Sequence, residues 1–252
     1  MNISKEVRLA NTDRQAATTM ASSRKIAIAA GVLYLLTFVS IPTLALYSQV
    51  RDPNYVVGPG PDTSVLIGAV LEVIVALANI GTAVALFPVL KKQTEGVALG
   101  FVGSRTLESA MIFAGVASLL SVVTLRRAGA GADALVVSHV LVALYDRAFL
   151  LGQSLMPAVN ALLLGSLLYR SRLVPRVLPL LGLIGAPLLI ASDAITLFGP
   201  GGPVTALSAM LALPIALWEF SLGIWLVAKG FNASAITSLS AKTATNELLT
   251  AA

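Results

Sequence analysis

Six long apolar segments dominate the sequence of 252 residues. Each is long enough to cross a membrane, because a helix rises about 1.5 Å per residue and the hydrocarbon layer is about 30 Å thick. Charged residues or turns rich in glycine and proline separate the segments. The sequence therefore predicts an all-α fold, a polytopic membrane helix bundle with six transmembrane helices over residues 26–46, 65–90, 98–125, 148–169, 177–198 and 204–228.

The composition also indicates an integral membrane protein. Hydrophobic residues make up 57% of the chain, charged residues 12%, and the mean hydropathy is +0.88, so the predicted partner is the lipid bilayer. The absence of cysteine excludes disulfides, thiolate metal sites and cysteine nucleophiles. The net charge of +5 does not indicate nucleic acid, because the basic residues lie at the ends of apolar segments and not in a patch with aromatic residues.

Lysine and arginine are concentrated on one side of the predicted bundle. Loops rich in these residues stay on the cytoplasmic side of a membrane. We therefore expect both termini in the cytoplasm, with a disordered tail over residues 1–25, a six-span domain over 26–231 and a flexible tail over 232–252. The residues on the cytoplasmic side are Lys5, Arg8, Arg14, Arg24, Lys25, Lys91, Lys92, Arg170, Arg172, Arg176, Lys229 and Lys242, and those on the other side are Arg51, Arg126, Arg127 and Arg147.

An apolar stretch over residues 134–145 is too short to cross a membrane unless it merges with the next segment. We expect an interfacial or re-entrant helix there, leading into a kinked fourth span that contains Pro157. A seven-span arrangement is the alternative. It would place Asp146 and Arg147 inside lipid with no turn after them.

Five polar residues on four predicted spans form a candidate site. Arg105 and Glu108 are three residues apart and share a helix face, and helix length places them and Glu219 about 11–15 Å below the cytoplasmic surface. Asn79 and Asn160 fall at similar depth. Charged side chains cost about 2.5–3.5 kcal/mol each at the centre of a membrane helix, so these groups should face protein or water.

A second, thinner polar layer is predicted toward the outer surface. Glu72 and Asp193 fall about 8–10 Å below that surface, and no cation within the spans accompanies them. We expect their partners to come from the loops or from the 134–145 helix, if that helix folds inward. The candidates are Arg51, Arg126, Arg127, Arg147 and His139.

Two functions fit these layers. The first is a polar cavity that binds or passes a small solute, a cation or protons, which the surplus of embedded carboxyl groups over Arg105 favours. The second is a structural or regulatory membrane subunit, in which interhelical hydrogen bonds of about 0.6–2 kcal/mol each only hold the helices together. No catalytic constellation, cofactor motif or metal motif is found, since His139 is the single histidine, and a non-enzymatic role is favoured.

Three motifs resemble one membrane family. They are Arg105-Thr-Leu-Glu108-Ser-Ala in the third span, the basic loop Leu168-Tyr-Arg-Ser-Arg-Leu-Val-Pro-Arg176, and Leu217-Trp-Glu-Phe-Ser-Leu-Gly-Ile-Trp-Leu-Val-Ala-Lys-Gly-Phe231. Over about residues 24–231 the chain is similar to the uncharacterised bacterial membrane family known as domain of unknown function 4386. The resemblance implies six spans and a bacterial origin, hence a bacterial inner or plasma membrane. It implies no activity, substrate or cofactor.

Overall fold

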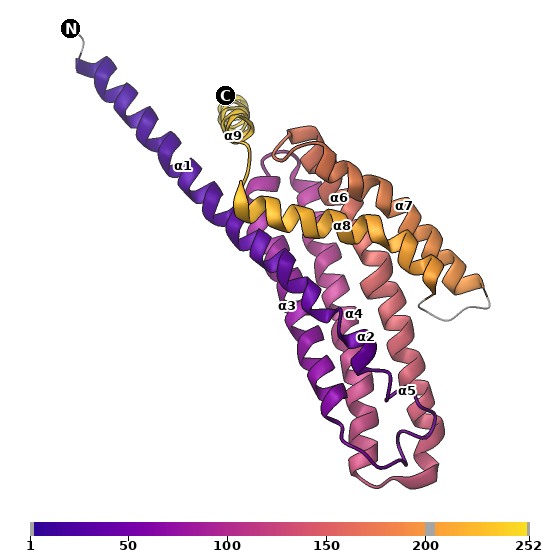
Figure 1. Ribbon diagram of the computed structural model, residues 1–252. Helices are drawn as coiled ribbons and strands as arrows, with labels where there is room; N and C mark the ends of the chain where they lie inside the picture. The colour runs from indigo at the N-terminus through magenta and orange to yellow at the C-terminus, as the bar shows by residue number, and fades with distance from the viewer. Residues whose placement is uncertain (1–2, 200–204, 251–252) are drawn as a thin grey trace.

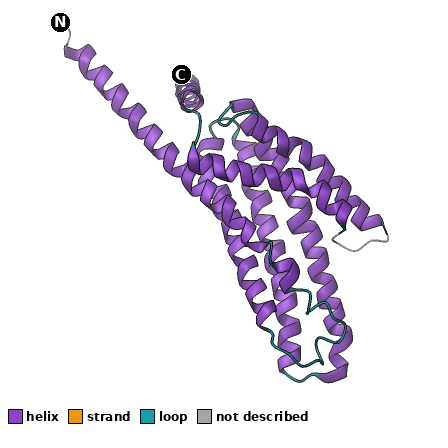
Figure 2. Ribbon diagram, in the orientation of Figure 1, coloured by secondary structure: helices purple, strands orange, loops and turns teal. Residues whose placement is uncertain are grey.

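The computed structural model describes residues 3–199 and 205–250, and this part is almost entirely helical, with no strand (Figures 1 and 2). Six helical stretches within it are long and apolar enough to cross a membrane, which confirms the all-α, six-span prediction. The elements are α1 (Ile3–Leu36), η1 (Thr37–Ser40), α2 (Thr43–Leu46), α3 (Thr63–Leu90), α4 (Glu95–Arg127), η2 (Gly131–Asp133), α5 (Ala134–Ala148), η3 (Phe149–Leu155), α6 (Met156–Ser171), α7 (Val177–Phe198), α8 (Ala206–Ala228) and α9 (Ala233–Thr250).

The spanning helices pack as a closed ring in the order α1, α3, α4, α6, α7 and α8. α7 and α8 lie side by side and run obliquely across the upper part of the molecule, whereas α3, α4 and α5 extend well beyond the end of α7 (Figure 1). α1 begins and α9 ends at the same end of the ring, which we call the terminal side, and the opposite end is the far side. α4 has 33 residues, or about 50 Å of helix, so it is longer than a hydrocarbon layer of about 30 Å.

Close helix contacts in the ring depend on glycine. Trp218 of α8 is fully buried and lies against Gly182 of α7, where a Cβ atom would be only 2.5 Å from the indole ring. Gly31 of α1 and Gly223 of α8 meet in the same way, because a Cβ on Gly31 would lie 2.7 Å from the Gly223 carbonyl oxygen. Small residues allow such approaches between membrane helices.

The outer faces of the spans carry exposed apolar side chains, among them Val70, Leu77, Val84, Met210 and Phe220. An exposed apolar surface of this kind belongs in lipid, because soluble proteins rarely expose large apolar patches. The chain is therefore a multi-pass membrane protein.

The segment before the first span differs from the expected disordered tail. α1 begins at Ile3 and continues into the membrane segment, and residues 3–25 contain neither glycine nor proline to end a helix. Arg24 ties the junction to α8, since its guanidinium donates hydrogen bonds to the carbonyl oxygens of Leu226 (3.1 Å) and Val227 (2.8 Å). The division into two tails and a membrane domain stays a prediction.

The segment after the last span also contains a helix, α9, where a flexible tail is expected. Ala235 and Ile236 in its first turn are buried against the core of the ring. Val204, the predicted start of the sixth span, and the glycine-proline turn before it lie outside the described residues. α8 begins at Ala206, after a capping box that Thr205 forms with Ser208.

The fourth span is one helical stretch, Gly131–Ser171, in which α5, η3 and α6 follow one another without a turn. The expected interfacial or re-entrant helix over 134–145 is therefore wrong, and so is the seven-span alternative, because residues 131–171 form one of only six candidate spans among the described residues. η3 is a π-helix that ends just before Pro157. The proline ring lacks an N–H and would clash with the carbonyl group of residue 153 in an α-helix, and the wider π-turn accommodates it.

Candidate functional site

Arg105 is the centre of a buried polar network on the inside of the ring. The residue is 1% exposed. Its Nη1 atom donates to Asn79 Oδ1 (2.9 Å) and Glu108 Oε2 (3.1 Å), and its Nη2 atom donates to Glu219 Oε1 (2.8 Å). Charge-assisted hydrogen bonds of this kind are about twice as strong as neutral ones. Arg105 therefore joins α4 to α3 and α8.

Two asparagines complete the network around Glu108. Asn79 Nδ2 donates to Glu108 Oε1 (2.9 Å), and Asn160 Nδ2 of α6 donates to Glu108 Oε2 (2.6 Å). All five residues of the predicted inner layer thus come together, although they lie on four helices. The sequence predicted their similar depth. The structure adds that their side chains point toward one another.

Aromatic rings cover part of the guanidinium group of Arg105. Its carbon lies 5.1 Å from the centre of the Tyr34 ring and 5.9 Å from that of Phe101, within the range of cation–π attraction. Glu108 is also buried, whereas the side chain of Glu219 is 13% exposed. Most of the network is therefore closed to solvent, and Glu219 is its most accessible acid.

Glu72, the first residue of the predicted outer layer, is surrounded by neutral donors. Tyr145 Oη (2.8 Å), Gln153 Nε2 (3.1 Å) and Tyr47 Oη (3.3 Å) all donate to its carboxyl oxygens. The expected arginine partner is wrong for this residue. Three neutral donors satisfy a buried carboxyl group without a second charge.

Asp193, the second residue of the outer layer, has one neutral partner. Ser154 donates to its Oδ1 atom, while Oδ2 is buried and has no hydrogen-bond partner among the described residues. Asp193 is 9% exposed. Its carboxyl group therefore retains an unused acceptor, which is costly in a buried place unless something else occupies it.

The expected loop partners have other contacts. Arg51 pairs with Asp146 (2.7 Å), and His139 Nε2 lies 3.2 Å from the Pro53 carbonyl oxygen. In the described part of the chain, none of these groups forms an ion pair or hydrogen bond with Glu72 or Asp193.

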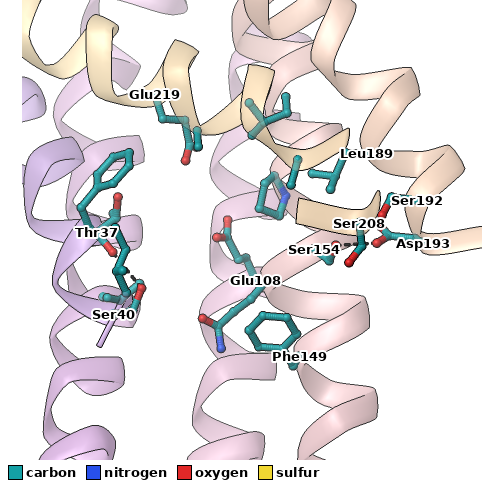
Figure 3. A pocket seen from close by; sticks show the side chains of 18 of the residues that line it. Thr37, Ser40, Glu108, Phe149, Ser154, Leu189, Ser192, Asp193, Ser208 and Glu219 are labelled. Carbon is teal, nitrogen blue, oxygen red and sulfur yellow. Dashed lines mark hydrogen bonds between the residues drawn. The ribbon is translucent and has the colours of Figure 1, made fainter. Parts of the chain in front are cut away.

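A cavity of about 350 Å³ reaches from the inner layer to Asp193 of the outer layer. Figure 3 shows Thr37 and Ser40 on one side of it and Asp193 on the opposite side, with Glu108 between them and Glu219 above. Its walls come from η1, α2, α3, α4, η3, α6, α7 and α8. The polar residues that line it are Thr37, Ser40, Asn79, Arg105, Glu108, Gln153, Ser154, Ser192, Asp193, Thr196, Ser208 and Glu219.

Sequence reasoning missed the hydroxyl and amide donors of the outer layer. Tyr145 and Gln153 are eight residues apart, a spacing that shares a face on a regular helix, but η3 begins between them and breaks that count. Tyr47 had no such signal, because it lies in the turn after α2. Ser154 belongs to η3, and the position of a side chain after a π-turn cannot be counted on a regular helix.

A second arginine–carboxylate cluster lies at the far side, outside the predicted layers. Asp62, just before α3, accepts hydrogen bonds from Arg127 Nε (2.7 Å), Tyr55 Oη (2.8 Å) and Arg126 Nη1 (3.0 Å). Burial alone would raise the pKa of Asp62, but the hydrogen bonds from Arg127 and Tyr55 and the charges of both arginines hold that pKa below its ordinary value. The cluster fastens the loop before α3 to the end of α4.

The profile of one protein family, described as Domain of unknown function (DUF4386), matches residues 29–230. The match includes the whole inner layer, both residues of the outer layer and every residue that lines the cavity. No curated protein and no solved structure matches the chain.

Proposed function

Since the chain belongs to the DUF4386 family, whose description assigns no function, we propose a function from the cavity itself: the protein binds a small organic cation there. Asp193 and Glu219 are the proposed counter-ions. The observation that carries this proposal is the buried Oδ2 atom of Asp193, which has no hydrogen-bond partner among the described residues and belongs to a cavity-lining side chain.

The volume of the cavity favours a molecule. Small-molecule sites in proteins enclose about 300–1,000 Å³ and combine apolar walls with a few convergent polar groups. The cavity of about 350 Å³ fits the lower end of this range, and Phe38, Ile41, Leu44, Phe149 and Leu189 supply apolar surface. A ligand with a small apolar body and one charged group would match both kinds of wall.

The charges that line the cavity favour a positive ligand. Glu108, Glu219 and Asp193 contribute three carboxyl groups, and Arg105 is the single basic residue in the lining. Arg105 already forms ion pairs with Glu108 and Glu219, so its positive charge is compensated within the lining. A protonated amine would supply the positively charged partner that the carboxyl group of Asp193 lacks.

The ligand groups favour an organic cation over a metal ion. The described residues contain no group of three or more histidine, cysteine, aspartate or glutamate side chains placed to hold a metal. An ammonium group needs fewer partners, because one carboxylate and one or two hydroxyl groups satisfy its three N–H donors. Ser154 and Ser192 line the cavity with Asp193.

Thermal unfolding of the purified full-length protein in detergent tests the proposal. The probes are benzylammonium, its neutral isostere benzyl alcohol and the anion benzoate. We expect only benzylammonium to raise Tm, since a ligand at about ten times its Kd stabilises the folded state by about 1.4 kcal/mol. D193N and E219Q should lower or abolish this shift.

The matched control is Asp133→Asn, which removes the same charge from an exposed residue outside the cavity. It should leave the benzylammonium shift unchanged. Equal shifts from benzyl alcohol and benzylammonium, no shift from benzylammonium, or an unchanged shift in D193N would each overturn the proposal.

A structural role is the second candidate function. The hydrogen bonds of Arg105 within the inner layer support it. The partners Asn79, Glu108 and Glu219 lie on other turns or helices, so the network holds the ring together whether or not a ligand binds. If the protein is only a structural or regulatory subunit, Asp193 and Glu219 variants would change stability alone, and no cation would shift Tm.

We also infer that the terminal side faces the cytoplasm, as the excess of lysine and arginine there indicates. The chain has no cysteine, so single-cysteine variants report orientation cleanly. In intact cells, a membrane-impermeant maleimide should label a cysteine at Arg127 and spare one at Lys91. The opposite pattern would reverse the orientation.

A further inference from the structure

A basic pocket lies on the terminal side, separate from the central cavity. It has a volume of about 440 Å³ and lies between the loop that joins α6 to α7 and the end of α8. A backbone hydrogen bond from Asn232 N to the Leu173 carbonyl oxygen (2.8 Å) joins the two sides, and Leu173 and Val174 are buried beneath them. The base of the pocket is therefore formed by buried, hydrogen-bonded backbone.

Three cations line this pocket without an acidic residue among them. They are Arg172, Arg176 and Lys229. None of the three forms an ion pair with another described residue. Arg176 lies over the ring of Tyr169 (5.0 Å), a contact that orients the guanidinium and leaves its charge in place.

The carbonyl groups at the end of α8 do not occupy the basic side chains of the pocket. The last carbonyl groups of a helix attract cations, but Arg24 of α1 already donates to those of Leu226 and Val227, and at 3.4 Å to that of Ala228. Lys229, directly after the helix, is therefore not required as its cap. The positive charge of the pocket remains available to a ligand.

The backbone of Arg172 gives a second indication. Its φ angle is +57°, the left-handed region that glycine occupies most easily, and it is the one such non-glycine residue in the described part of the chain. The position ends α6, where its N–H bonds the Leu168 carbonyl oxygen, and glycine is the common choice there. Strain of this kind clusters at binding sites, and here it keeps a charged side chain at the pocket.

The aromatic residues of the pocket place it at the level of lipid headgroups. Trp225 and Phe231 line it, and the indole Nε1 of Trp225 is buried without a hydrogen-bond partner among the described residues. Tryptophan is enriched where the hydrocarbon layer meets the headgroups. Beside the pocket, Val177 and Ile224 expose apolar side chains on which an acyl chain can lie.

We propose that this pocket binds a phosphate group, and that its source is the headgroup of an anionic membrane lipid. Arginine and lysine recognise phosphate through charge-assisted hydrogen bonds, and basic pockets between membrane helices bind anionic headgroups. The indole N–H of Trp225 supplies one further donor.

The test uses quenching of Trp225 fluorescence in the full-length protein in a neutral detergent. Lipids with brominated acyl chains quench nearby tryptophan, and the other tryptophan, Trp218, is fully buried. We expect brominated phosphatidylglycerol to quench at a mole fraction at least about tenfold lower than brominated phosphatidylcholine, since each of the three basic residues contributes up to roughly fivefold and even two of them would exceed this difference. Trp225→Phe should remove the lipid-dependent signal.

The pocket variant is R172Q/R176Q/K229Q, and its matched control is K91Q/K92Q/K242Q, which removes three charges from the same side outside the pocket. The preference for phosphatidylglycerol should disappear in the first and persist in the second. Equal quenching by both lipids in the parent protein, or an unchanged preference in the pocket variant, would overturn the proposal. Displacement of the lipid by millimolar glycerol 3-phosphate would overturn the lipid source and assign the pocket to soluble phosphate esters.

Discussion

Two clusters of the same chemistry lie at different depths in this protein. In the inner one, a single arginine, Arg105, lies between the carboxylates of Glu108 and Glu219. In the far-side one, a single carboxylate, Asp62, lies between the guanidinium groups of Arg126 and Arg127. The inner cluster has a formal surplus of one negative charge and the far-side cluster a surplus of one positive charge.

Burial separates Arg105 from Arg127 more than geometry does, since the ion-pair distances in the two clusters are similar. Arg105 is 1% exposed, whereas the side chain of Arg127 is 59% exposed. The side chain of Arg126 is 10% exposed and lies between these extremes. Water solvates and screens an exposed charge, so its pairing contributes about 0–1 kcal/mol. A buried charge has lost its water, so removal of its partner costs about 3–5 kcal/mol. Depth in the membrane therefore determines what each ion pair contributes.

The largest effect is expected from Arg105→Met. The substitution leaves Glu108 and Glu219 without their shared cation, and the free energy of unfolding in detergent should fall by about 3–5 kcal/mol. Chemical unfolding followed by circular dichroism measures it. The matched substitution Arg126→Met in the far-side cluster should cost clearly less, and equal losses would contradict the depth dependence.

A double substitution sharpens the same point. In R105M/E108Q one stranded carboxylate is removed, and Glu219, which lines the cavity, is the acid that remains. We expect the double variant to recover about 1–3 kcal/mol relative to R105M, because coupled charges are not additive. A double variant less stable than R105M would show that Glu108 stabilises the ring independently of Arg105.

Asp62→Asn should have an intermediate effect of about 1–2 kcal/mol, since the half-buried Arg126 loses a charged acceptor. The folded-state pKa of Asp62 is lowered, so its contribution is present above the ordinary carboxyl range and is lost as the pH falls through the lowered pKa. The Tm difference between parent and D62N should therefore shrink between about pH 6 and pH 3. A difference that grows on acidification would reverse the sign of the linkage.

The smallest effect is expected from Arg127→Gln. Its guanidinium is mostly in water, so the loss should stay within about 0.5 kcal/mol and should vanish at high salt, where surface pairs are screened. Tm measured in low and high salt for parent and variant checks this. A loss as large as that of Asp62→Asn, unaffected by salt, would show that the far-side cluster behaves as a buried one.

Much of the fold was predictable, and the inner layer was predictable by depth. Arg105, Glu108 and Glu219 stand out because charged residues are rare in apolar segments, and residue counting places them at one level. The partners of Glu72 and Asp193 were not predictable. Neutral donors such as Tyr145 and Ser154 do not stand out in a sequence, and they were overlooked in favour of arginines.

The sequence by itself determined that this chain crosses a membrane six times and carries a charged layer in its interior. Segment length and hydropathy suffice for both, because lipid accepts only helices of a certain length and rejects unpaired charge. Only the tertiary structure decided which polar groups touch, that one cavity joins the inner layer to Asp193, and that Asp193 keeps an unused oxygen atom. The rotation and tilt of each helix set these contacts, and the length and hydropathy of a segment determine neither.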